Sequence, residues 1–259
     1  MFIVLIILII LLFFFGGFFI YKRRHFEPKI LTTGEGIDYL TRCDDGYFTK
    51  FRDLDWRVRK VKNLDEYMKK IEKSVTFPSA DIRDLIFKGI EKADDYLNQV
   101  SLQWFDNKDN RKIQWRIVLI DGTLYENGLP HTRGNVIVMP VDLVKSPNFI
   151  NTLIHERVHV IQRIFKRNAN RYIEANKYSR YKHINETRAR INPDTDDYIY
   201  KDANNKINIA EYTKNPKSIH DVEYKPVPGT QTSEHPYEKM AISIADGYKE
   251  YLYNKNLRS

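Results

Sequence analysis

Residues 148–165 read NFINTLIHERVHVIQRIF, and this stretch decides both the local fold and the chemistry that the chain can carry. Apolar residues recur along it at the 3.6-residue spacing of an amphipathic helix, at Ile150, Ile154, Val158, Ile161 and Phe165. The stretch is therefore predicted to form one helix with an apolar face.

The predicted helix contains the pentapeptide HERVH at residues 155–159. Four residues apart on a helix, His155 and His159 lie on one face and can hold a single Zn²⁺, while Glu156 points at the open position of the metal. This pattern is typical of hydrolysis by metal-activated water, with Glu156 as the general base. The alternative is two partly buried histidines on a packed helix, with Glu156 in a surface pair.

With this pentapeptide on a helix, the chain resembles the zincin metallopeptidases. The resemblance implies an α+β domain with a small mixed sheet, an edge strand, an active-site helix and a C-terminal ligand helix. Residues 134–140, GNVIVMP, are predicted to supply the edge strand, with residues 136–139 lining the cleft and binding an extended substrate by β-augmentation. The layout is also similar to uncharacterised metallopeptidase-like proteins of large DNA viruses.

A catalytic zinc ion needs a third protein ligand. The metzincin subclass is excluded, because Gln162 and Phe165 stand where it requires glycine and histidine. Residues 233–241, SEHPYEKMA, predict a second helix that begins at Pro236. In gluzincins such a helix delivers a glutamate, and this likeness implies Glu238 as the third ligand.

Other assignments remain open for these residues. Glu234, His235 and His220 are rival ligands, and Glu238 could instead be a first-turn carboxylate that complements the helix dipole. The resemblance also implies a Tyr or His that stabilises the oxyanion. The candidates for that role are Tyr198, Tyr200, Tyr212, Tyr224 and His220.

Other segments fit the same plan. Ser79 is predicted to begin a helix with an apolar stripe, residues 112–120 to form a strand, and Asp121-Gly122 to form a turn. Residues 166–232 are polar and are expected on the far side of the cleft. The predicted division is an anchor at 1–24, a basic N-terminal extension at 25–78 and the zincin-like domain at 79–259.

Residues 2–20 are an unbroken apolar run, and nineteen residues at about 1.5 Å each make roughly 28 Å, enough to span a bilayer. The run predicts a single N-terminal transmembrane helix. Lys22, Arg23 and Arg24 follow it, so the positive-inside rule predicts that the rest of the chain lies on the cytoplasmic side of a membrane. The single cysteine, Cys43, permits no internal disulfide and agrees with a reducing compartment.

A net charge of +8, with a basic cluster between residues 57 and 70, suggests contact with anionic lipid headgroups. No zinc-finger, RRM or KH pattern accompanies the charge, so a nucleic-acid partner is not expected. The expected function is a membrane-anchored zinc peptidase that acts on proteins or peptides. The alternatives are a catalytically inactive zincin-like scaffold and a membrane-anchored structural protein, for example of a virion.

Overall fold

The structure, a computed structural model, describes residues 26–42, 44–186, 188–224 and 235–257. Its α-helices are α2 (Thr33–Arg42), α3 (Asp53–Val58), α4 (Leu64–Ser74), α5 (Ala80–Leu97), α6 (Phe149–Ile164), α7 (Arg167–Ala175) and α8 (Pro236–Asn256). Its strands are β1 (Lys29–Ile30), β2 (Val75–Thr76), β3 (Arg116–Ile120), β4 (His131–Arg133), β5 (Val136–Pro140), β6 (Ser179–His183), β7 (Tyr198–Lys201), β8 (Ile207–Asn208), β9 (Ala210–Tyr212) and β10 (Val222–Tyr224). Short 3₁₀ helices span Phe48–Lys50, Asn107–Lys112, Glu126–Gly128, Val141–Lys145 and Ile184–Glu186.

The main sheet has five strands in the order β1-β3-β5-β4, and β2 also pairs with β3. Strands β1, β3 and β5 are parallel, whereas β4 and β2 run antiparallel to their neighbours. Apart from Arg116 at the start of β3, strands β3 and β5 are apolar, because both faces of the sheet are covered. Ile117 and Ile137 face a core with α5, α6 and α8, whereas Val118 and Val138 face a second core with α2 and α4.

The prediction that residues 136–139 form an edge strand is wrong. Residues 136–139 belong to β5, which lies between β3 and β4 and is buried throughout. A strand whose successive residues are all apolar has two covered faces, which is the pattern of a central strand. The edge strand is instead β4, paired with β5 through a tight turn at Gly134, whose φ is +54°.

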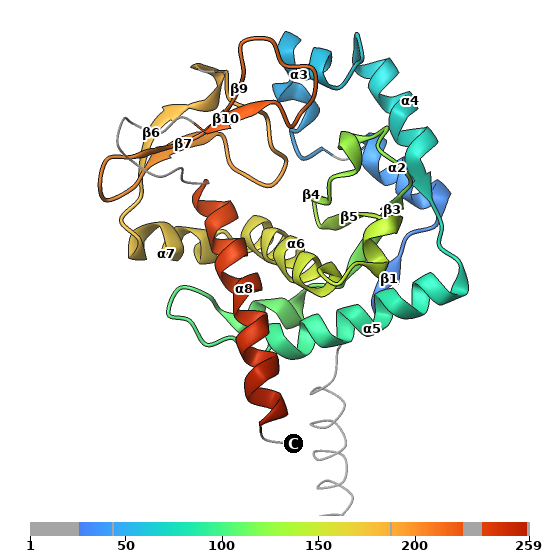
Figure 1. The fold of residues 1–259 in the computed structure, drawn as a ribbon, viewed down its shortest axis with the longest axis vertical. Coiled ribbons are helices and arrows are strands. Elements are labelled where there is room, and N and C mark those ends of the chain that lie inside the picture. Colours follow the sequence, from blue (N-terminus) through green and yellow to red (C-terminus); the bar gives the residue numbers. More distant parts are fainter. Residues whose placement is uncertain (1–25, 43, 187, 225–234, 258–259) are drawn as a thin grey trace, which may run out of the picture.

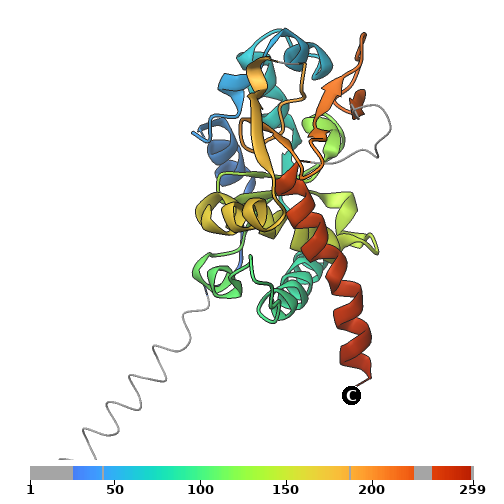
Figure 2. The ribbon, with the colours of Figure 1, turned by 90° about the vertical axis from the view of Figure 1, so that its left-hand side faces the viewer.

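Three predicted helices are confirmed. Helix α5 has Ser79 as its N-cap, α6 spans the HERVH stretch, and α8 begins at Pro236. Helix α8 packs along α6, and its C-terminal turns extend past α5 (Figures 1 and 2). The predicted strand at 112–120 begins later, at Arg116, because a 3₁₀ helix precedes it.

The predicted basic N-terminal extension is not separate from the rest of the fold, because its strands belong to the main sheet. Residues 29–76 contribute β1 and β2, and their helices α2 and α4 cover the second face (Figure 1). Two further small sheets, β6-β7-β8 and β9-β10, lie at the upper left in Figure 1, and residues 47–58 pack against them.

The structure does not support the predicted N-terminal transmembrane helix. The run on which it was placed, residues 2–20, lies outside the described residues, and none of the helices described is both long and apolar enough to cross a membrane. The longest, α8, is amphipathic and carries Lys239, Asp246 and Glu250 along its length. What the structure supports is a mixed α and β architecture with small sheets.

Candidate metal centre

Two helices bring the three predicted ligands together. His155 and His159 lie one turn apart on α6, and Glu238 lies in the first turn of α8. Glu238 Oε2 is 3.2 Å from His155 Nε2 and 3.4 Å from His159 Nε2, and the two ring nitrogens are 3.0 Å apart. The buried small residues Ala241 and Ala245 of α8 belong to the core that α6 shares.

The arrangement fits a zinc ion. Ligand atoms about 2.0–2.1 Å from a tetrahedral zinc stand about 3.3 Å from one another, and the three separations here are 3.0, 3.2 and 3.4 Å. Two Nε2 lone pairs and a carboxylate oxygen repel at this range unless a metal cation or a proton lies among them. Among the described residues, this is the one group of three or more His, Cys, Asp or Glu side chains with metal-binding geometry.

The charges in the cluster depend on one another. Burial alone would lower the pKa of His159, but the carboxylates of Glu238 and Asp194 outweigh it and raise this pKa to about 10. Burial opposes ionisation of Glu238, yet His159 and His155 hold the pKa of its carboxyl well below the ordinary value. Without a metal, the cluster therefore attracts a proton to the place where a cation would bind.

Glu156 is buried beside this cluster, 3% exposed. Burial raises the pKa of its carboxyl well above the ordinary value, and the nearby Asp194 raises it further. The Thr132 hydroxyl on β4 donates to Glu156 Oε2 at 3.1 Å, which fixes the orientation of the carboxylate.

A cavity of about 460 Å³ adjoins the cluster. Its lining includes His155, Glu156, Glu238, Asn192, Asp194 and His220. A second cavity, of about 620 Å³, is lined by His159 and Gly134, and Asp194 lines both. The two cavities adjoin opposite ends of β4, because His131 lines the first and Gly134 the second.

The rival ligands that the structure describes, His235 and His220, do not belong to the three-residue cluster. His235 is the N-cap of α8, and its Nε2 contacts the Tyr198 carbonyl at 3.1 Å and Asp196 at 3.3 Å. His220 lines the first cavity with an exposed side chain, and Glu234 lies outside the described residues. Of the oxyanion candidates whose side chains the structure describes, His220 alone lines the cavity with Glu156.

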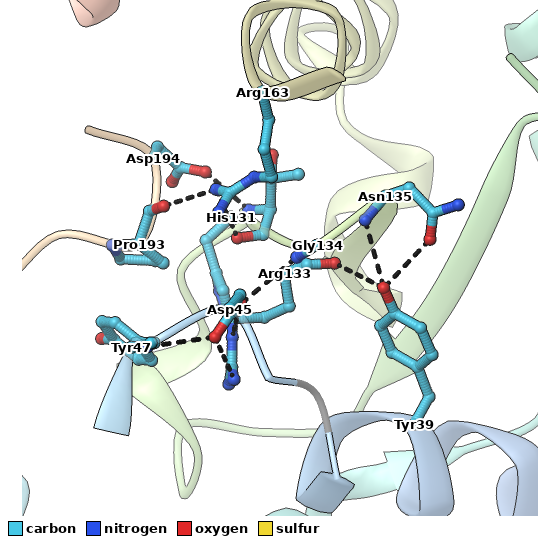
Figure 3. Close-up of polar contacts among 12 residues, drawn as sticks. Tyr39, Asp45, Tyr47, His131, Arg133, Gly134, Asn135, Arg163, Pro193 and Asp194 are labelled. Atoms are coloured by element: carbon cyan, nitrogen blue, oxygen red, sulfur yellow. Dashed lines mark hydrogen bonds and ion pairs between the residues drawn. The ribbon is translucent and has the colours of Figure 1, made fainter. Parts of the chain in front are cut away.

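The outer edge of β4 is occupied by the protein's own side chains. Thr132 is the residue of β4 whose N–H and carbonyl face outward, since hydrogen-bonded and non-hydrogen-bonded pairs alternate along an antiparallel pair of strands. Its N–H donates to Asp194 Oδ1 at 2.8 Å, and its carbonyl accepts from Arg163 at 3.5 Å. Figure 3 shows Arg163 also reaching the carbonyl of Pro193, at 2.5 Å. An extended substrate would have to displace Asp194 to pair with this edge.

The far end of β4 is held in the same way. Asp45 accepts from Arg133 Nε at 2.6 Å and from the Gly134 N–H at 3.2 Å, and the Tyr39 hydroxyl contacts the Arg133 carbonyl (Figure 3). The strand is therefore positioned by residues from the N-terminal part of the chain.

Sequence reasoning missed the part of the site that residues 190–194 supply. Asn192 donates to Glu238 Oε1 at 2.7 Å, so the third predicted ligand is bound on both its oxygens. Asp194 faces Thr132 and influences Glu156. No local signal marks these residues, because they lie in an irregular polar segment and act only through contacts distant in sequence.

Comparisons of the chain with family models, with curated proteins and with solved structures find no match.

Proposed function

We propose that the protein is a zinc-dependent metallopeptidase, in which His155, His159 and Glu238 hold the metal and Glu156 is the general base. The observation that carries this proposal is the convergence of two imidazole nitrogens and one carboxylate oxygen within 3.0–3.4 Å of one another. Two nitrogens and one oxygen are a ligand set of catalytic zinc sites, which leave the fourth position to water or substrate.

Zn²⁺ held by these residues would polarise the carbonyl of the scissile bond and lower the pKa of water at the open position. Glu156 would take a proton from the attacking water and pass it to the leaving amine. Two features bear on this relay: burial and Asp194 raise the pKa of Glu156, which makes its ionised carboxylate a stronger proton acceptor, and Thr132 fixes its orientation. The adjoining cavity would hold the side chains of a protein or peptide substrate.

The test uses the full-length protein, a mixture of peptides of varied sequence, and mass spectrometry of both the products and the bound metal. We expect stoichiometric zinc and new peptide ends. Glu156→Gln should lower kcat/KM by about 10²–10⁴-fold while zinc stays bound, because the substitution removes the proton acceptor but no ligand. His159→Ala should lose both zinc and cleavage.

Glu91→Gln is the matched control, because Glu91 is an exposed glutamate on α5. It should keep wild-type zinc and cleavage. A wild-type protein that takes up no zinc contradicts the proposal. If the protein binds zinc but shows no cleavage, or only cleavage that Glu156→Gln leaves unchanged, the result supports the inactive scaffold instead.

A further inference from the structure

Gln162 lies one turn beyond His159 on α6 and is 1% exposed. Its side-chain amide makes two contacts. Oε1 lies 2.8 Å from Nδ1 of His159, and Nε2 lies 2.9 Å from the main-chain carbonyl of Tyr237 in the first turn of α8. A buried amide with both ends bound is held in one orientation.

The Tyr237 carbonyl determines that orientation. A carbonyl oxygen only accepts hydrogen bonds, so the NH₂ group of Gln162 must face it. The amide oxygen of Gln162 then faces His159, and this oxygen can also only accept. His159 must therefore carry its proton on Nδ1, which leaves Nε2 of the neutral ring with a lone pair.

That nitrogen is the one in the cluster. Nε2 of His159 lies 3.0 Å from His155 Nε2 and 3.4 Å from Glu238 Oε2. Tyr237 directly precedes Glu238, so the same amide also connects α6 to the turn that carries the third predicted ligand. One side chain thus determines both the tautomer of one ligand and the approach of another.

We propose that Gln162 is a positioning residue for the metal cluster, which sets the His159 tautomer and holds the first turn of α8 against α6. This inference rests on the proposed function, because it assumes that the cluster binds zinc. Glutamine suits both tasks, since the amide at the end of its side chain has an oxygen that accepts from His159 and an NH₂ group that donates to Tyr237. Glutamate keeps the acceptor but not the donor, and methionine, of similar size, provides no donor and only a weak acceptor.

The experiment compares Gln162→Met and Gln162→Glu in the full-length protein, with Gln103→Met as the control at an exposed glutamine. Zinc affinity is measured by competition with a chelator. The ring Nδ1–H of His159 is followed by ¹H–¹⁵N correlation spectra of the zinc-loaded protein, in which Nε2 would bind the metal and the ring would be neutral. Far-ultraviolet circular dichroism checks that each variant is folded.

Gln162→Met should bind zinc about 10–100-fold more weakly, the usual cost of losing a group that orients a ligand, and its Nδ1–H resonance should move upfield or disappear. Gln162→Glu should keep that resonance and recover part of the affinity. A Met variant with wild-type zinc affinity, or a Glu variant as impaired as the Met variant in both measurements, overturns the inference.

The two proposals fail differently. If the wild-type protein binds no zinc, the metallopeptidase proposal is wrong, and the role of Gln162 as a positioning residue for the metal falls with it. If the wild type binds zinc and Gln162→Met binds it equally well, only the inference about Gln162 is wrong.

Discussion

At the scale of single residues, His235 and Glu238 show how position within a helical turn separates two candidate ligands. His235 caps α8, and its Nδ1 accepts from the Tyr237 N–H at 3.2 Å. Its other nitrogen faces the Tyr198 carbonyl and Asp196. Glu238, three residues later, faces His155 and His159. His235 is the N-cap, whose non-helical backbone lets its side chain turn back to the N–H of the first turn, whereas Glu238 lies within the helix.

This geometry predicts different effects of removing the two side chains. Glu238→Ala should lose stoichiometric zinc because it removes an oxygen ligand. His235→Ala should keep zinc and lose about 1 kcal/mol of folding stability with the helix cap. Metal content by mass spectrometry and unfolding in urea measure the two effects. Loss of zinc in His235→Ala alone would reverse the ligand assignment.

At the scale of elements, α5 and α6 approach closely at Gly89. A Cβ at this position would lie 2.6 Å from Cε1 of Phe149 and 3.0 Å from Cδ1 of Leu153, both on α6. An aromatic ring in a packed core cannot move aside without disturbing its neighbours. The glycine therefore permits the contact that supports the helix carrying the predicted ligands.

Gly89→Ala is expected to destabilise the protein. Overpacking costs about 1–3 kcal/mol, which outweighs the gain of about 1 kcal/mol in helix propensity. Gly34→Ala in α2 is the control, because nothing lies within 4 Å of the added Cβ, and it should leave stability unchanged or raise it. Urea unfolding measures both variants. A stabilised Gly89→Ala would show that the two helices are not closely packed there.

A second prediction at this scale concerns the edge of β4. Asp194→Ala removes the acceptor of the Thr132 N–H, which lies at the middle of the strand. Losing one such hydrogen bond, about 1.5 kcal/mol, should speed amide exchange at Thr132 by roughly tenfold. Asp197→Ala, which removes a partner of Lys50 instead, should leave this amide unchanged. Unaltered exchange in Asp194→Ala would mean that another group protects the edge.

At the scale of the whole molecule, a buried ion pair joins distant parts of the chain. Arg59 donates to Glu126 from Nε at 2.8 Å and from a terminal nitrogen at 3.0 Å, and it contacts the Tyr212 hydroxyl on β9 at 3.4 Å. Tyr67 on α4 also donates to Glu126. The pair thereby connects the N-terminal helices, the turn before β4 and one of the small sheets.

This pair predicts a loss of stability in acid. Burial opposes ionisation of Glu126, but Arg59 outweighs it and lowers the pKa of the carboxyl to about 2. Because the folded pKa lies below the unfolded value, the stabilisation is complete above about pH 4.5 and is lost as the pH falls towards 2. The difference amounts to about 3 kcal/mol.

Urea unfolding between pH 5 and 2 tests this expectation. Glu126→Gln should be less stable at pH 5, because the buried Arg59 loses one of its two carboxylate partners and keeps only Asp55, and its stability should depend less on pH over this range. The prediction is wrong if the wild type and the variant lose stability in parallel as the pH falls.

The amino-acid sequence by itself predicts α5, α6 and α8, together with the pairing of His155 and His159 on one face. These features are local. A helix is closed by bonds between residues four apart, and its caps and apolar stripe lie within the same segment. The choice of Glu238 rests on a local pattern, the helix start at Pro236, together with the resemblance to gluzincins.

The tertiary structure alone decides which strand is the edge and what surrounds the ligands. Strand β5 is central because β3 and β4 flank it, and this depends on partners outside its own segment. Thr132 and Asp194 are 62 residues apart, and Asn192 and Glu238 are 46 apart. No periodicity within a segment encodes such contacts, because they form only after separate elements have packed against one another.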